Sequence, residues 1–200
     1  GLHHLEGGPV PMWIPAIGTA VSIAMVLPIT AVSINFHATA FKDIGKAWSY
    51  LPLRFVVFGT LSYAIASYIG ILFTLPGVAK ITQFSIINEF HFNQRMYGFF
   101  SMVIFGMVYH MLPRLTGKEV NGWVTSLHFW SSALGVVVLL LACLLGGLTH
   151  GLLAQQPELA WAARVVAAVK PYFLISEIAF IILGVSQLVF VINVCLSIGC

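Results

Sequence analysis

Five long apolar segments dominate the pattern of hydrophobic and polar positions, at residues 12–38, 53–75, 86–112, 120–148 and 172–198. Each is long enough for a helix to cross a hydrocarbon core, which takes about 20 mostly apolar residues. Prolines stand at segment edges, where helices are expected to begin or end: Pro52, Pro76, Pro113 and Pro171. Pro28 lies inside the first segment, where a membrane tolerates a kink. The pattern predicts an all-α membrane protein with about five transmembrane helices, forming a single domain over residues 1–200.

The composition supports membrane insertion independently of the pattern. Sixty per cent of the residues are hydrophobic, only 8% are charged, and the mean hydropathy is +0.99. A soluble domain carries about 25% charged residues, so a soluble protein and a nucleic-acid-binding protein are both excluded. The cysteines form no CxxC or CxxCH motif, so they indicate neither zinc, c-type heme nor a disulfide framework: Cys143, Cys195 and Cys200.

The basic residues between the segments predict the orientation. With the N-terminus on the outer side, five basic residues fall on the cytoplasmic side: Lys42, Lys46, Arg54, Arg114 and Lys118. Three fall outside: Lys80, Arg164 and Lys170. This excess follows the positive-inside rule, so we expect the N-terminus outside and the C-terminus in the cytoplasm. His3 and His4 then lie on the same side as the start of the third segment.

The third segment is the most informative part of the chain, because five strongly polar residues precede its apolar run: Asn88, Glu89, His91, Asn93 and Arg95. Polar and ionisable residues within a membrane span are costly, and they mark functional sites facing a bundle interior. Helical spacing places Glu89 and Asn93 on one face and His91 with Arg95 on the other, since residues two apart differ by about 200°. Together with His3 and His4, these residues indicate a metal or heme centre. A polar seam of hydrogen bonds between helices is the alternative.

Several separated motifs carry a family resemblance. They are GLHHLEGGPVPMW at 1–13, AVSINF at 31–36, LRFVVFG at 53–59, HFNQRMYGFFSMVIFG at 91–106 and LPRLTG at 112–117. In this order they resemble the C-terminal half of subunit I of heme-copper oxidases. The cbb-type cytochrome c oxidases are the most similar branch, and nitric oxide reductases are near relatives. The resemblance implies a partial subunit I-like helical bundle.

The resemblance also implies roles for individual residues. His3 and His4 match the histidine pair that binds the active-site copper, and His91 matches the axial ligand of the high-spin, b-type heme. Asn93 stands where the family has the low-spin heme ligand, and an amide cannot replace an imidazole there. We therefore expect the low-spin heme to be absent or differently ligated. Glu89 and Arg95 belong to the same polar region and are further candidate site residues.

The activity implied by the resemblance is reduction of dioxygen to water by a respiratory terminal oxidase in the bacterial inner membrane. Electrons would come from c-type cytochrome subunits, and the N-terminal half of subunit I, or an equivalent chain, would supply the remaining ligands. One alternative is a nitric oxide reductase-like subunit, with non-heme iron in place of copper. Another is a cofactor-poor structural subunit of a respiratory complex, which Asn93 favours and the three retained histidines oppose.

The other polar residues of the spans give weaker signals. Three histidines lie near segment ends, where we expect them to be hydrated and uncoordinated: His110, His128 and His150. Glu177 lies within the last segment, where a proton path or a hydrogen-bonded packing role are both open. Gly147 and Gly151 have the GxxxG spacing of helix dimers, but a single match at a segment end is weak evidence.

Overall fold

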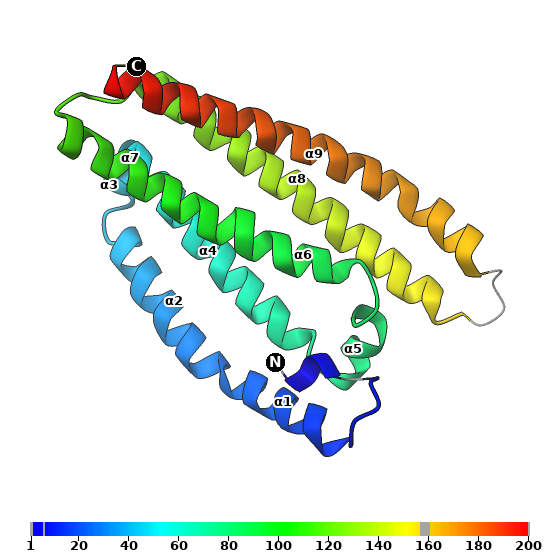
Figure 1. Ribbon diagram of the computed structural model, residues 1–200. Coiled ribbons are helices and arrows are strands. Elements are labelled where there is room, and N and C mark those ends of the chain that lie inside the picture. The colour runs from blue at the N-terminus through cyan, green and yellow to red at the C-terminus, as the bar shows by residue number, and fades with distance from the viewer. Residues whose placement is uncertain (1, 6, 157–160, 200) are drawn as a thin grey trace.

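Long helices make up the molecule, in a bundle with two arms (Figure 1). The computed structural model describes residues 2–5, 7–156 and 161–199, and these form no strand. The helices in chain order are η1 Leu2–Leu5, α1 Trp13–Ala24, α2 Val26–Phe41, α3 Ile44–Ser49, α4 Leu51–Leu72, α5 Pro76–Thr82, α6 Ile87–Asn93, the π-helical η2 Gln94–Ser101, α7 Met102–Thr116, α8 Gly122–Ala154 and α9 Trp161–Ile198.

Five helical stretches are long and apolar enough to cross a membrane, which confirms the predicted spans. They are Trp13–Phe41, Leu51–Leu72, Ile87–Thr116, Gly122–Ala154 and Ala163–Ile198. Helices can span a bilayer because every interior backbone N–H and C=O is bonded within the helix. The first and last described residues lie toward opposite ends of the bundle, as an odd number of spans requires (Figure 1).

The prolines divide into two groups. Pro52 and Pro76 stand in the first turns of α4 and α5, where a missing N–H costs nothing, and this confirms their prediction as helix starts. Pro113 and Pro171 lie inside α7 and α9, so their prediction as segment edges was wrong. The third span ends instead at Gly117, which adopts φ 68° and donates its N–H to the carbonyl of Pro113.

The first span is divided at Met25, between α1 and α2 (Figure 1). Pro28 follows three residues later, and its ring removes one hydrogen-bond donor from the first turn of α2. The kink expected at this proline is therefore observed as a break one turn earlier. Only 11% of the most apolar window in this span is buried, so these two helices are the least packed part of the bundle.

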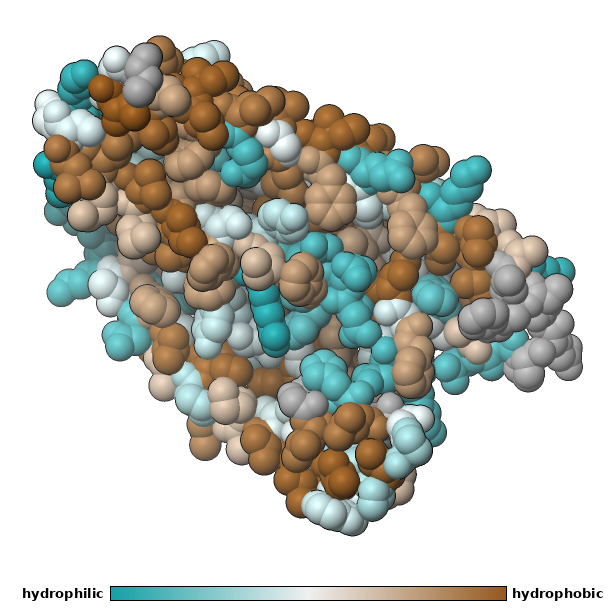
Figure 2. All heavy atoms as spheres, in the orientation of Figure 1, coloured by the Kyte–Doolittle hydropathy of each residue, from teal (hydrophilic) through white to brown (hydrophobic). Residues whose placement is uncertain are grey.

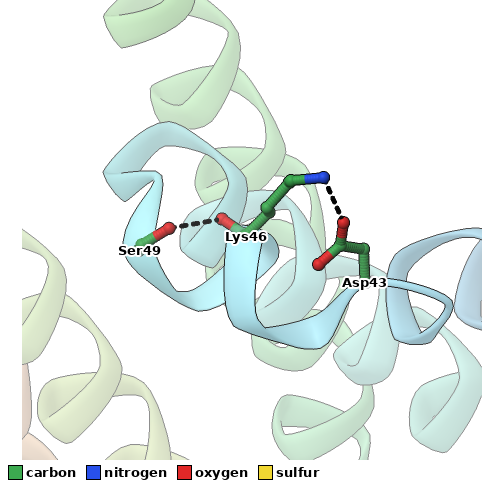
Figure 3. Close-up of polar contacts among 3 residues, drawn as sticks. All are labelled: Asp43, Lys46 and Ser49. Carbon is green, nitrogen blue, oxygen red and sulfur yellow. Dashed lines mark hydrogen bonds and ion pairs between the residues drawn. The ribbon is translucent and has the colours of Figure 1, made fainter.

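A short connection joins the first two spans at the end of the molecule away from η1. The Lys46 ammonium in α3 lies 2.5 Å from the Asp43 carboxylate, and the Ser49 hydroxyl donates to the carbonyl of Lys46 (Figure 3). Arg54 lies over the ring of Trp48 and donates to its carbonyl. These contacts fix the turn that brings α4 back alongside α2.

Close packing of the long helices α8 and α9 forms the other arm, and half of the most apolar window in α8 is buried. Glycines on α8 permit close approach of other segments. A Cβ at Gly147 would lie 2.5 Å from the backbone nitrogen of Ile87, and one at Gly151 would lie 2.0 Å from the carbonyl oxygen of Ile81. The GxxxG spacing therefore serves contacts with α5 and α6 of the same chain.

A polar cluster lies inside this arm, among α7, α8 and α9. Tyr109 shares a hydrogen bond of 3.0 Å with Nδ1 of His128, and Asn193 donates to the Thr125 hydroxyl at 2.8 Å. Three phenylalanine rings pack on the His128 ring: Phe55, Phe105 and Phe190. His128 is completely buried, so its prediction as a hydrated residue was wrong. The expectation failed because His128 lies on the face of α8 that packs against α7 and α9.

Candidate functional site

The third span presents different residues on its two sides, as helical spacing predicts. His91 and Arg95 border one cavity, whereas Glu89 and Asn93 border another. The helix changes to a π-helix at Gln94, directly after these residues. The Ser101 hydroxyl bonds the carbonyl five residues earlier, that of Met96, at 2.8 Å. π-Helical turns are rare and occur frequently at functional sites, but no sequence pattern indicated this one.

The His91 side of the span opens into a cavity of about 530 Å³. Its walls come from the junction of α1 with α2, from α4, and from the α6–η2 segment. Most of the lining is apolar or aromatic, and hydroxyl groups of Ser67 and Tyr63 are also present. Cavities of about 300–1,000 Å³ with such linings hold small molecules and cofactors. Hydrophilic residues gather on the visible surface between α6 and the N-terminal segment (Figure 2).

A glycine on α4 makes room for the imidazole of His91. A Cβ at Gly70 would lie 2.5 Å from Cε1 and 3.0 Å from Nε2 of His91, so even alanine would displace the ring. Phe73, one turn further along α4, packs edge-on to the same imidazole. The residues fit a planar group held by His91, because the imidazole borders a mostly apolar cavity and the missing side chain at Gly70 leaves room for its ring. Neither Gly70 nor the other residues of α4 that line this cavity were identified from the sequence. Small residues four apart, Ala66 and Gly70, were the available signal.

Arg95 is the charged residue among those that line this cavity. It lies one helical turn after His91 on the same side, and long side chains in a helix lean toward its N-terminus. Its guanidinium therefore extends toward the level of His91. The prediction that these two residues share a face is confirmed.

The N-terminal segment lies beside the start of the third span. The Gln83 amide donates to the carbonyl of His4 at 2.6 Å, and Gly7 packs against the ring of Phe84. Partial burial and the positive charge of Arg95 both lower the pKa of His4, which favours the neutral, metal-binding form of its imidazole. His4 thus lies on the same side of the bundle as His91, as the sequence predicts.

The described residues do not form a complete metal site. They contain no group of three or more histidine, cysteine, aspartate or glutamate side chains that could hold a metal ion. The backbone of His3 lies in η1, but its side chain lies outside the described part of the chain. Copper on His3 and His4 would therefore require a ligand from outside the described residues.

On the opposite side of the third span, Asn93 borders a smaller cavity of about 300 Å³. This residue is only 4% exposed, and its amide lies 3.8 Å from the Cys143 sulfur on α8. The Cys143 sulfur lies 4.0 Å from the hydroxyl of Ser176 on α9. The expected polar contact to a neighbouring helix is thus present, with Cys143 rather than Glu89 as the observed hydrogen-bond partner. An amide in this position does not fit an axial heme ligand.

The remaining weaker candidates lie away from the His91 cavity. His110 bonds the hydroxyl of Tyr50 at 2.8 Å, and Nδ1 of His150 accepts from the N–H of Ile86 at 3.3 Å. Glu177 is exposed on α9. None of these residues lines the cavity beside His91.

Comparison with known proteins places this arrangement in a class. The fold matches that of a heme-copper terminal oxidase dimer solved by cryo-electron microscopy, with a TM-score of 0.72 and 14% identity over 98% of this chain and 39% of the other. The family model of cytochrome c and quinol oxidase polypeptide I matches residues 1–194. The chain belongs to that family and is an integral membrane protein.

Curated relatives agree with this assignment. The cytochrome c oxidase subunit 1 homolog of Agrobacterium tumefaciens is 24% identical over 99% of this chain and 38% of its own length. The cbb3-type cytochrome c oxidase subunit CcoN1 of Stutzerimonas stutzeri is 25% identical over 76% of this chain and 33% of its own length. Subunit 1 of Rhodobacter capsulatus cytochrome c oxidase is 25% identical over 79% of this chain and 30% of its own length. The chain spans about a third of the length of these relatives.

Proposed function

We propose that this chain forms the C-terminal part of the catalytic subunit of a respiratory terminal oxidase, which reduces dioxygen to water with electrons from cytochrome c. The observation that carries the proposal is the His91 imidazole, which borders a mostly apolar, cofactor-sized cavity and lies against Gly70. Membership of the family supports the oxidoreductase class. The fit of the cavity supports a heme as its occupant.

His91 would hold a b-type heme through Nε2, and that heme would supply oxygen binding and electron transfer. The chain itself contributes position and environment. Gly70 leaves space for the imidazole, and the ring of Phe73 limits its rotation. The apolar lining excludes water from the ligand bond, which strengthens electrostatic interactions there. His3 and His4 would bind copper together with a ligand from outside the chain.

The assembly needs further components. We propose that the N-terminal half of subunit I, or an equivalent chain, covers the cavity side of the bundle, where the first span is least buried. A c-type cytochrome subunit would dock at the side of the membrane that carries His4. The positive-inside rule supports a periplasmic location for this side. The bundle would lie in the bacterial inner membrane.

The assignment of His91 is tested by replacing it with alanine in the assembled complex. We expect His91→Ala to abolish the high-spin heme spectrum and its shift with carbon monoxide. His110→Ala is the matched control, because His110 lies on the same span but bonds Tyr50 at the other end. A variant that keeps both the spectrum and the shift would show that another residue holds the heme.

The copper ligands are tested separately. The double variant His3→Ala with His4→Ala should lose one copper per complex in metal analysis, and high-spin heme should remain. Loss of one non-heme iron instead would favour a nitric oxide reductase-like subunit. Unchanged content of both metals would contradict the assignment of His3 and His4.

The alternative of a cofactor-poor structural subunit is favoured by Asn93, whose amide contacts Cys143 and is a poor heme ligand. Heme content separates the two functions. A purified complex in which this chain carries no heme on either side would support the structural subunit.

A further inference from the structure

Arg95 is a charged group in an apolar span, and nothing in its described surroundings balances its charge. The described residues contain an ion pair between Lys46 and Asp43 at the far end of α2, and Arg95 makes no hydrogen bond or ion pair with any of them. Glu89 lies on the opposite side of the helix, at another cavity. A guanidinium has five N–H donors and stays protonated, so it requires an acceptor within the membrane.

The cavity that Arg95 borders offers donors rather than anions. Its lining contains hydroxyl groups and a histidine but no carboxylate: Ser22, Tyr63, Ser67, Thr74 and His91. Two of these hydroxyls donate to nearby backbone carbonyls: Ser22 to Gly18 at 2.8 Å and Thr74 to Ile71 at 2.7 Å. A cavity with a fixed cation and no carboxylate has a positive potential, which low-polarity walls strengthen.

From this placement we propose that Arg95 is an anion-binding residue of the His91 cavity. The proposal adds an anion-binding residue to the cavity beside His91. It rests on the proposed function only in taking a heme as the bound cofactor. The anion has two sources with the same chemistry: a carboxylate carried by a bound cofactor, or a free small anion beside it. Arginine suits either, because its planar fork binds a carboxylate through two parallel hydrogen bonds.

The cofactor source is tested with the heme-free protein and a metal-free porphyrin. Protoporphyrin IX has two free carboxylates, whereas its dimethyl ester has none, and neither needs an iron ligand from His91. We expect the wild-type protein to bind the free acid more tightly than the ester, with binding followed by porphyrin fluorescence. Arg95→Gln should weaken binding of the free acid by about tenfold or more and leave the ester unchanged.

The free-anion source is tested by thermal unfolding of the same heme-free protein. Sodium formate replaces sodium gluconate, a bulkier anion, at constant ionic strength. Binding of formate to the folded protein should raise the unfolding midpoint of wild type. Arg95→Gln should lose this increase, and Arg95→Lys should keep part of it because it retains the charge without the planar fork.

Arg54→Gln is the matched control in both experiments, since Arg54 lies outside the cavity over Trp48. A change in the porphyrin experiment identifies a cofactor carboxylate as the anion, and a change in the formate experiment alone identifies a free anion. If Arg95→Gln changes neither result, the proposal is overturned. Because neither experiment uses iron, failure of the His91 heme assignment would be seen separately.

Discussion

The two sides of the third span differ in how completely protein fills them. On one side, His91 faces a cavity of about 530 Å³ beside α1, α2 and α4. On the other, Asn93 is nearly fully buried against α8, with its amide 3.8 Å from Cys143. The cavity beside Asn93 is smaller, about 300 Å³. The difference teaches that one helix can pack closely on one side and leave more room for a ligand on the other.

Glycine has opposite uses on these two sides. On α8, the absence of a side chain at Gly147 and Gly151 lets backbone approach backbone. On α4, its absence at Gly70 leaves space for a functional imidazole. Adding a methyl group at each position therefore separates close packing from ligand space.

The largest expected effect on stability is that of Gly151→Ala. Its new methyl group would lie 2.0 Å from the carbonyl oxygen of Ile81, so α8 must move away from α5. We expect a loss of about 1–3 kcal/mol or more in the free energy of unfolding, measured by denaturation in detergent. Gly184→Ala is the control, since nothing lies within 4 Å of a Cβ there. Equal stability of the two variants would contradict the close packing of α5 on α8.

The polar cluster of the packed arm should contribute about 1–3 kcal/mol through buried hydrogen bonds. Asn193→Ala removes the amide that donates to Thr125, so the buried Thr125 hydroxyl loses this hydrogen bond. Thr125→Val removes the other partner with little change in volume. We expect the double variant to lose less stability than the sum of the single variants, in a double-mutant cycle of unfolding free energies. Strict additivity would show that the two residues act independently.

On the cavity side, Gly70→Ala should change ligand binding more than stability. The methyl group meets the His91 side chain rather than backbone, and a side chain can shift at smaller cost than a helix. We expect heme content to fall while the unfolding midpoint stays within a few degrees of wild type, about what 1 kcal/mol produces. Spectral heme quantification and thermal unfolding on one sample measure both. A loss of stability as large as that of Gly151→Ala would mean that this side is also scaffold.

The smallest effect is expected for Asn93→Ala. The amide–sulfur contact is long and weak, so its loss should cost about 1 kcal/mol or less. Because Asn93 ligates no iron in this account, the heme spectrum should be unchanged. A changed heme spectrum in Asn93→Ala, with the fold intact, would place a cofactor on this side after all.

The long elements could be predicted from the sequence because membrane spans depend on a local property, the length of an apolar run. The two faces of the third span were predictable for a similar reason, since the positions of His91 and Asn93 follow from helical spacing. Pro113 and Pro171 were misplaced because an apolar environment holds a helix together across a proline. A proline in the sequence does not by itself show whether its surroundings will keep the helix continuous.

The surroundings of the site could not be predicted, because they depend on contacts between distant segments. Gly70 lies 21 positions before His91 in the chain, and only the packing of α4 on α6 brings them together. His128 was expected at a wet span end, but the aromatic residues that enclose it come from α4, α7 and α9. Such neighbours are not encoded in the local sequence around a histidine.

The central claim is that a cofactor binds on the His91 side of the third span and not on the Asn93 side. The most direct test is a reduced-minus-oxidised spectrum of the purified complex, combined with the quantity of b-type heme per copy of this chain. The account predicts a high-spin, carbon monoxide-reactive heme that disappears in His91→Ala, and no low-spin heme ligated from residue 93. A six-coordinate low-spin heme ligated at position 93, or the absence of any heme that depends on His91, would contradict it.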